Sequence, residues 1–458
     1  MSPGGILLLS CYELGHQPNG LASPLAFLER AGFAPQALDL AVQPLDDGLV
    51  RHAHFVGISV PMHTALRLGI GVARHVRRVN PAAHVCFYGL YATLNAGYLL
   101  DGIADSVVGG EYEEALVALV ESLEPGPGGG GPGGPGGPGG PVLQRLDFPV
   151  PSRRALPALQ TYAALLENDE RRPAGYVEAS RGCLHHCLHC PIPPVYGGRF
   201  FIVPADVVLA DVRSQVAAGA THITFGDPDF LNGPGHSLKI VRAMHAEFPA
   251  LTFDCTAKIE HLLQRRALLP ELARLGCRFL VSAVESLSDV VLAHLEKGHT
   301  RADVYAVLAA TREAGIALRP SFVPFTPWTT LDDYLELLDF VADQDLVHHV
   351  DAVQLGIRLL VPPGSALLDR PAMRAFLGPL DAAALTYTWT HPDPRMDVLQ
   401  RDVMAIVGRA AEEEADPETT FLSVRAAAYR TAARGAPLAP TWTVPRPRPP
   451  RLTEPWFC

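Results

Sequence analysis

The chain has 458 residues, of which 48% are apolar and 19% charged, so it is long enough for two or three domains with buried cores. Its 37 Lys and Arg against 48 Asp and Glu give a formal charge of −11, which argues against general binding to nucleic acid or to an acidic membrane surface. No apolar run approaches the roughly 20 residues of a membrane span, so we expect a soluble, cytoplasmic protein.

Residues 1–124 alternate short apolar runs with amphipathic stretches. This pattern predicts strands and helices in alternation, which indicates an α/β domain with a doubly wound parallel sheet. The predicted strands cover 5–10, 35–40, 55–60, 84–90 and the start of 106–123, and the helices cover 21–32, 65–81 and the rest of 106–123.

The pattern of this domain, and the segment VVGGEYEEAL near its end, resembles a cobalamin-binding domain. Members that ligate cobalt through His carry Asp-x-His-x-x-Gly after the first strand. Here the position two before His16 is Leu14, so we interpret Leu14-Gly15-His16 as an ordinary loop. The resemblance is one of fold, and the sequence leaves open whether the domain binds cobalamin.

Residues 125–141, PGPGGGGPGGPGGPGGP, are entirely Gly and Pro and can hold neither a helix nor a strand ladder. We interpret them as a linker that spans roughly 23 Å as a coil. The domain before the linker is therefore expected to move relative to the part after it.

A cluster of cysteines follows the linker. Residues 176–200 read YVEASRGCLHHCLHCPIPPVYGGRF, with YVEAS as a strand candidate and Cys183-x3-Cys187-x2-Cys190 in the loop after it. This spacing resembles the signature of the radical S-adenosylmethionine (SAM) superfamily. A 4Fe–4S cube needs four ligands, usually thiolates, and three leave one iron open for the amino and carboxylate groups of SAM. The resemblance therefore implies a 4Fe–4S cluster and SAM as cofactors.

A zinc site is the main alternative for these cysteines. Together with His185, His186 or His189 they would form a closed Cys3His site. Against zinc, no second ligand pair follows downstream at the usual spacing, so we favour the cluster. We interpret the isolated Cys255 and Cys277 as core thiols.

The region 142–365 continues as a strand and helix series. A helix is predicted over 204–218, and with the strand before the cysteines there are six strands, which indicates the partial (β/α)6 barrel of the superfamily, with its chemistry at the carboxyl ends of the strands. The later strands cover 222–230, 251–257, 277–286, 316–325 and 351–361. Residues 366–458 are expected to be mainly helical, especially 397–415 and 420–435, with a Pro-rich tail.

The superfamily resemblance also implies SAM-binding residues at the strand ends. Gly226-Asp227 stands where the family often has Gly-Gly-Glu and binds the methionine amine. Glu285 closes the fourth strand, where a carboxylate commonly meets the amine or ribose. Ser321 on the fifth strand is expected to reach the ribose or carboxylate, and Arg319 to pair with the carboxylate.

A closer resemblance rests on three segments: SRGCLHHCLHCPIPPVYGGRF, RPSFVPFTPWTTLDDY (319–334) and LTEPWFC (452–458). Together they resemble the radical SAM proteins named for a CUAEP or CCAEP tail. The resemblance implies transfer of a 3-amino-3-carboxypropyl group from SAM to trivalent arsenic, as in arsinothricin biosynthesis. Cys458 is then a candidate catalytic thiol, because trivalent arsenic is thiophilic, and Trp456 and Phe457 would dock the tail. We also expect that the natural chain continues past Cys458 with selenocysteine.

Two further hypotheses remain open on the sequence alone. One is a cobalamin-dependent radical methyltransferase or another radical group transfer. The other is a non-enzymatic protein that binds zinc or an iron–sulfur cluster. For the enzyme we expect a small-molecule substrate and a reductant of the flavodoxin or ferredoxin type, with neither nucleic acid nor membrane as a partner.

Overall fold

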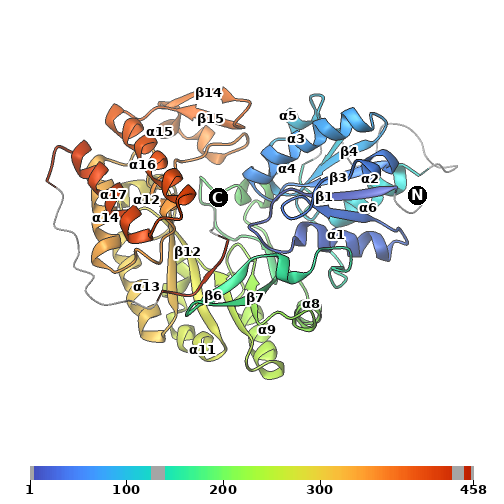
Figure 1. Ribbon diagram of the computed structural model, residues 1–458, viewed down its shortest axis with the longest axis horizontal. Helices are drawn as coiled ribbons and strands as arrows, with labels where there is room; N and C mark the ends of the chain where they lie inside the picture. The colour runs from blue at the N-terminus through green and yellow to red at the C-terminus, as the bar shows by residue number, and fades with distance from the viewer. Residues whose placement is uncertain (1–4, 125–139, 436–447, 455–458) are drawn as a thin grey trace.

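The computed structural model describes residues 5–124, 140–435 and 448–454. Figure 1 shows an N-terminal lobe on one side, a curved sheet with outer helices below, and a C-terminal helical region on the other side. The linker lies almost entirely outside the described residues.

The N-terminal domain is the predicted doubly wound sheet. Its five strands are all parallel and lie in the order β2-β1-β3-β4-β5. In β1, Leu7 and Leu9 join one apolar cluster while Ile6 and Leu8 join the other, so the sheet is covered on both faces. The elements are β1 (Ile6–Ser10), α1 (Asn19–Arg30), β2 (Gln36–Asp39), α2 (Asp47–His52), β3 (Phe55–Ser59), α3 (His63–Val79), β4 (His84–Tyr88), α4 (Leu90–Leu94), α5 (Ala96–Leu100), β5 (Ser106–Val108) and α6 (Glu113–Ser122).

The second domain is a half-barrel, as the sequence predicts. Its sheet runs β13-β12-β11-β10-β7-β6-β16, in which β7 and β10 to β13 are parallel and β6 and β16 are antiparallel additions at one edge. The strands are β6 (Ala164–Glu167), β7 (Glu170–Val177), β10 (His222–Phe225), β11 (Thr252–Thr256), β12 (Cys277–Glu285), β13 (Ala317–Phe322) and β16 (Arg451–Leu452). The helices are α8 (Ala205–Ala217), α9 (Pro234–Glu247), α10 (Ile259–Gln264), α11 (Leu269–Arg274), α12 (Asp289–His294), α13 (Arg301–Ala314) and α14 (Leu331–Asp343).

The predicted sixth barrel strand, 351–361, is wrong. This segment forms a 3-10 helix, Ala352–Leu355, followed by a single parallel bridge between Phe325 and Arg358. The reason is that the Gln354 side-chain oxygen accepts the Phe322 backbone N–H at 3.2 Å, which is an edge hydrogen bond of β13 that a sixth strand would otherwise take.

The cysteines lie in a loop that is closed at its base by a small separate sheet. The strand candidate YVEAS is split: β7 ends at Val177, and β8 (Ser180–Gly182) pairs instead with β9 (Phe200–Ile202). A short helix, α7 (Ile192–Tyr196), follows the last cysteine.

The C-terminal region contains the two expected helices, α16 (Pro394–Glu412) and α17 (Pro417–Thr431). It also contains a short helix, α15 (Pro371–Arg374), and an antiparallel pair of strands, β14 (Leu377–Asp381) and β15 (Thr386–Trp389), which the expectation of a mainly helical region omitted. No helix in the described part of the chain has the length and apolarity that a bilayer crossing requires.

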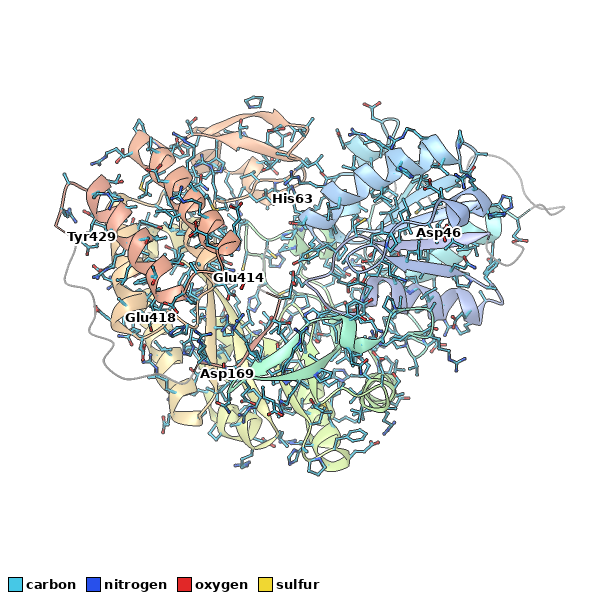
Figure 2. The ribbon with its side chains drawn as sticks, in the orientation of Figure 1. Asp46, His63, Asp169, Glu414, Glu418 and Tyr429 are labelled. Carbon is cyan, nitrogen blue, oxygen red and sulfur yellow. The ribbon has the colours of Figure 1, made fainter. Side chains whose placement is uncertain are left out.

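The C-terminal region returns to both other domains. The His63 ring lies 2.8 Å from the carbonyl oxygen of Ala384, and Figure 2 labels His63 on the side of the N-terminal lobe that faces this region. Strand β16 extends the barrel sheet, and just after it the Tyr12 hydroxyl donates to Glu454 at 2.9 Å. Gly15, with φ +69°, is required here because a Cβ would lie 2.7 Å from the Glu454 side chain.

Candidate functional site

Cys183, Cys187 and Cys190 lie together in the loop between β8 and α7, which follows the carboxyl end of β7. Cys187 is buried and the other two are half-buried. The loop is internally turned, with the Cys190 N–H donating to the Cys187 carbonyl at 3.2 Å, and it is attached to the segment after α12 because the Leu188 N–H donates to the Leu295 carbonyl at 3.0 Å. All three predicted ligands therefore lie in one loop, and their role as ligands stays a prediction.

Burial governs the chemistry of the thiols. It raises the pKa of Cys183, and it raises the pKa of Cys190 to about 12, against a lowering contribution from the Lys297 ammonium. Lys297 is only 3% exposed and interacts with the Cys187 and Cys190 thiols. A buried positive charge at this position favours thiolates over thiols, which is what a metal cluster needs from its ligands.

Glu285 connects this lysine to the cysteine loop. Its carboxylate lies 3.3 Å from the Lys297 Nζ and 3.0 Å from the His189 Nε2, and His189 stands between Cys187 and Cys190. Burial alone would raise the pKa of Glu285, but Lys297 and His189 outweigh it and bring the pKa to about 2. Glu285 ends β12, as the sequence predicts for the fourth strand, and its role in binding SAM stays a prediction.

The backbone at Glu285 is strained. Its φ is +66°, in the left-handed region that a glutamate rarely adopts, and the register between β12 and β13 shifts between Ala283 and Glu285. Strain of this kind persists only where surrounding contacts over-determine it, and it concentrates at functional sites. Lys297 and His189 supply those contacts.

Gly226 and Asp227 follow β10, but both are engaged within the protein. A Cβ at Gly226 would overlap the Tyr176 hydroxyl. The buried Asp227 accepts hydrogen bonds from the Ala179 N–H at 2.9 Å and from the Ser180 hydroxyl, and burial raises its pKa to about 7. Asp227 thus fixes the segment that leads into the cysteine loop, and its role in binding the methionine amine stays a prediction.

Arg319 and Ser321 share one face of β13, opposite Leu318 and Phe322, which belong to the core under the helices. Arg319 is paired with Asp351 at 3.0 Å. Their contacts to SAM also stay predictions.

The prediction for the two isolated barrel cysteines is confirmed. Cys255 and Cys277 are both buried in the hydrophobic core of the barrel.

The sequence did not predict a chain of polar side chains that lies beside the cysteine loop. Lys258 Nζ lies 3.0 Å from His185 Nδ1, His185 Nε2 lies 3.2 Å from His261 Nε2, and His261 Nδ1 lies 2.7 Å from Asp229 Oδ2. His185, Asp229 and His261 are close enough to share a metal ion. However, Lys258 can only donate, so the hydrogen of neutral His185 belongs on Nε2, and that atom is not free to ligate. We therefore interpret the group as a chain of polar contacts, in which Lys258, His185 and His261 are hydrogen-bonded and His261 is paired with Asp229 by charge.

The loop histidines bear on the zinc hypothesis as well. His185 faces Lys258 and His261, and His189 faces Glu285, so these two rings are directed to other partners. The third loop histidine, His186, is exposed. Three thiols in one loop beside a buried ammonium fit a 4Fe–4S cluster with one open iron, which Cys183, Cys187 and Cys190 would hold.

The crevice of the N-terminal sheet is where a cobalamin would have to fit. Open α/β sheets bind ligands where the strand order reverses, here between β1 and β3. In this place Glu13 accepts the backbone N–H groups of Asn19 (2.8 Å) and Gly20 (3.1 Å) at the start of α1, which is the position that otherwise suits a ligand phosphate. The fully buried Tyr88 donates to the Gly20 carbonyl at 2.8 Å, and a Cβ at Gly20 would overlap the Ser59 hydroxyl.

The space beside the Gly109-Gly110 turn of the same domain is also occupied by other parts of the chain. A Cβ at Gly109 would overlap the Thr93 hydroxyl, and one at Gly110 would overlap the Val142 carbonyl. His16 does not face an open space either, since its ring stacks on Tyr176 of β7 with 4.7 Å between centroids. The residues present therefore do not fit the nucleotide tail of a cobalamin, because the chain's own side chains occupy the crevice.

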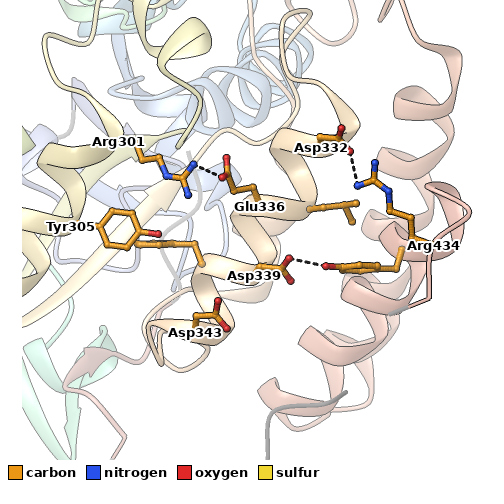
Figure 3. A pocket seen from close by; sticks show the side chains of 10 residues that line it. Arg301, Tyr305, Asp332, Glu336, Asp339, Asp343 and Arg434 are labelled. Carbon is orange, nitrogen blue, oxygen red and sulfur yellow. Dashed lines mark hydrogen bonds and ion pairs between the residues drawn. The ribbon is translucent and has the colours of Figure 1, made fainter. Parts of the chain in front are cut away.

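A cavity of about 370 Å³ lies elsewhere, on the outer helices α13, α14 and α17 (Figure 3). The acidic groups along it are mostly paired: Asp332 with Arg434 at 2.8 Å, Glu336 with Arg301, and Asp339 with the Tyr429 hydroxyl. We assign no function to this cavity. Cys458, with Trp456 and Phe457, lies outside the described residues, so its predicted role is not tested.

Comparison with known proteins agrees with this geometry. Residues 177–341 match the model of the Radical SAM superfamily, so the chain contains a radical SAM domain. The match to this superfamily implies a 4Fe–4S cluster and SAM as cofactors.

Among individual proteins, a putative methylthiotransferase of Methanocaldococcus jannaschii is 23% identical over 185 residues, and the ribosomal protein uS12 methylthiotransferase RimO of Geobacter sulfurreducens is 28% identical over 189 residues. Each alignment covers 37% of this chain and 39% of the relative, so the chain matches well under half the length of these proteins.

Two solved structures share the fold over more of the chain. The radical SAM methyltransferase TsrM from Kitasatospora setae, with cobalamin and a 4Fe–4S cluster bound, has a TM-score of 0.59 and 18% identity over 74% of this chain and 73% of its own. The cobalamin-dependent SAM radical enzyme OxsB, with aqua-cobalamin bound, has a TM-score of 0.65 and 15% identity over 87% of this chain and 66% of its own. The order of a Rossmann-type domain followed by a half-barrel is therefore that of cobalamin-dependent radical SAM structures.

Proposed function

We propose that this protein is a radical SAM enzyme that cleaves SAM and transfers a group to a small-molecule substrate. The observation that carries the proposal is the gathering of Cys183, Cys187 and Cys190 in one loop of the radical SAM domain, beside the buried pair Lys297 and Glu285. A bound 4Fe–4S cluster would supply one electron to the sulfonium of SAM. A reductant of the flavodoxin or ferredoxin type is part of the proposal.

The residues of the chain have defined tasks in this scheme. The three thiolates hold three irons, and the Lys297 ammonium balances their charge in a buried place where water cannot. Glu285 fixes Lys297 on one side and His189 of the loop on the other. Because Glu285 stays ionised, it also suits the ammonium group of a methionine moiety at the same edge.

For the transferred group we propose 3-amino-3-carboxypropyl and, as its acceptor, trivalent arsenic. The support is the resemblance of the three sequence segments to the family with the CUAEP or CCAEP tail, together with the thiophilic character of arsenic, which suits the Cys458 thiol. The pairing of β16 with β6 holds the tail against the barrel sheet as far as Glu454. Cobalamin-dependent methyl transfer is the alternative: the structural similarity to TsrM and OxsB favours it, and the side chains in the N-terminal crevice oppose it.

Anaerobic reconstitution with iron and sulfide tests the proposal. We expect a brown protein whose reduced cluster gives an electron paramagnetic resonance (EPR) signal that SAM perturbs. Stoichiometric zinc without such a signal would instead favour the non-enzymatic alternative. The cleavage product then distinguishes the reactions: methylthioadenosine supports aminocarboxypropyl transfer, and 5′-deoxyadenosine contradicts it.

A further inference from the structure

Both ends of the cysteine loop, residues 183–190, contact the same segment of the N-terminal domain. This acidic segment comprises residues 109–113 and reads GGEYE. Arg181 stands two residues before the loop, and Tyr196 ends the helix that follows it. Both side chains are at least nine-tenths buried, and both reach across the domain boundary.

Arg181 is held by several groups at once. Its Nη1 lies 2.7 Å from the Glu113 carboxylate and 3.7 Å from that of Glu111, and its Nε lies 2.8 Å from Glu178 of its own domain. The guanidinium also stacks over the Phe148 ring at 5.0 Å. The side chains of Glu111 and Glu113 are fully buried, so this contact is shielded from water and salt.

Tyr196 makes the matching contact at the other end. Its hydroxyl donates to the Glu111 carboxylate at 3.0 Å. The ring packs against Gly182, which has φ +72°, and a Cβ there would lie 2.8 Å from the ring and overlap the Arg199 carbonyl. The two ends of the loop therefore touch each other as well as the acidic segment.

We propose that Glu111 and Glu113 are positioning residues of the iron–sulfur site, through which the N-terminal domain holds both ends of the loop. The inference rests on the proposed function, because it requires a cluster on the three cysteines. Groups that fix metal ligands from behind determine how tightly the metal is held and how it responds to its other ligands. In this chain the domain that resembles a cobalamin carrier contacts the residues that flank the cysteine loop on both sides.

A contact that only joins two domains would behave differently from a positioning contact. Its loss would lower the unfolding temperature and leave the cluster unchanged in the protein that remains folded. Loss of a positioning contact changes the cluster itself, in the rate at which iron is released and in the EPR change that SAM produces.

The experiment compares Tyr196→Phe with Tyr429→Phe in the full-length, reconstituted protein. Both substitutions remove one hydroxyl that donates to a carboxylate, but Tyr429 donates to Asp339, at 2.7 Å, on the outer helices. Figure 2 labels Tyr429 in the C-terminal region, away from the N-terminal lobe. We expect Tyr196→Phe to release iron to a chelator about tenfold faster than wild type and to alter the EPR response to SAM. Tyr429→Phe should do neither.

Substitutions of Glu113 form the second part of the experiment. Glu113→Gln removes the charge that faces Arg181 and should accelerate iron release as Tyr196→Phe does, whereas Glu113→Asp keeps the charge and should restore part of the wild-type behaviour. If Glu113→Gln fails to fold, Tyr196→Phe decides alone. Wild-type iron release and EPR response in the folded variants would overturn the inference and leave the proposed function standing. Failure of the wild type to assemble a cluster would overturn the proposed function, and the inference with it.

Discussion

The two parallel sheets of this chain both present the carboxyl ends of their strands, where α/β proteins bind ligands, and they differ in what lies there. In the N-terminal sheet, Glu13 and Tyr88 fill the crevice and bond to α1. In the barrel, the same edge carries three cysteines and a carboxylate held in a strained backbone. Equal topology therefore does not give equal function, because side chains decide whether the edge is closed or reactive.

Two buried glutamates express this difference as opposite pKa shifts. Glu13 is 8% exposed, and burial raises its pKa to about 8. Glu285 is 6% exposed, and Lys297 and His189 overcome the effect of burial to lower its pKa to about 2. The closed crevice thus favours a neutral acid, while the barrel edge holds a permanent charge next to the loop.

The largest expected effect is at the cysteines of the barrel edge. Replacing Cys183, Cys187 or Cys190 with Ala should abolish cluster assembly and SAM cleavage, because each thiolate holds one iron. Iron and sulfide content, with chromatography of the cleavage product, measures this. The Cys255→Ala control should keep both and lose only about 1 kcal/mol of stability as a small core truncation. Wild-type cleavage by Cys187→Ala would refute the assignment.

The second largest effect is expected at the buried ion pair of Glu285 and Lys297 in the barrel. Glu285→Gln leaves the Lys297 charge uncompensated and should destabilise the protein by about 3–5 kcal/mol at neutral pH. Because the folded pKa lies below the unfolded value of 4.5, the stabilisation by Glu285 is present above pH 4.5 and is lost as pH falls toward 2. Denaturant unfolding at pH 7 and pH 3 measures it, with the exposed surface pair residue Glu296→Gln as the control. Equal stability of Glu285→Gln and wild type at pH 7 would contradict the pairing.

The contribution of Glu13, in the N-terminal crevice, to the stability of the protein should depend on pH in the opposite direction. The folded pKa of Glu13 lies above 4.5, so its contribution to stability is complete below pH 4.5 and is lost as pH rises toward 8. Glu13→Gln should therefore flatten the fall in stability between pH 5 and 8 by roughly 3–4 kcal/mol. The exposed Glu121→Gln is the control. An unchanged slope would show that Glu13 is not buried as a neutral acid.

The smallest expected effect concerns the binding of cobalamin by the N-terminal domain. Hydroxocobalamin incubated with the full-length wild type should pass through gel filtration separately and keep its free absorption spectrum, because Glu13 and Tyr88 occupy the crevice. Corrinoid retained in proportion to protein would show that the crevice opens and would revive cobalamin-dependent group transfer.

Much of the fold follows from local sequence patterns. The strands of the N-terminal domain lie within a residue or two of their predicted bounds where an apolar run is followed by Gly, Pro or a charged turn, as at GILLLS and FVGISV. The segment 351–361 has a similar apolar pattern but no strand, since the Gln354 side chain takes the hydrogen bond of its would-be neighbour. A strand needs a partner, and the sequence of one segment does not contain it.

The cysteine ligand set was predicted from the sequence alone, because the three thiols lie within eight residues and their spacing limits which of them can meet. The groups around them were decided only by the tertiary structure. Lys297 and Glu111 come from segments far from the cysteines in the chain, and nothing in their local sequence indicates burial or partner. The strength of an electrostatic interaction depends on how well neighbouring side chains exclude water from it. Those neighbours come from other elements, and only folding brings them together.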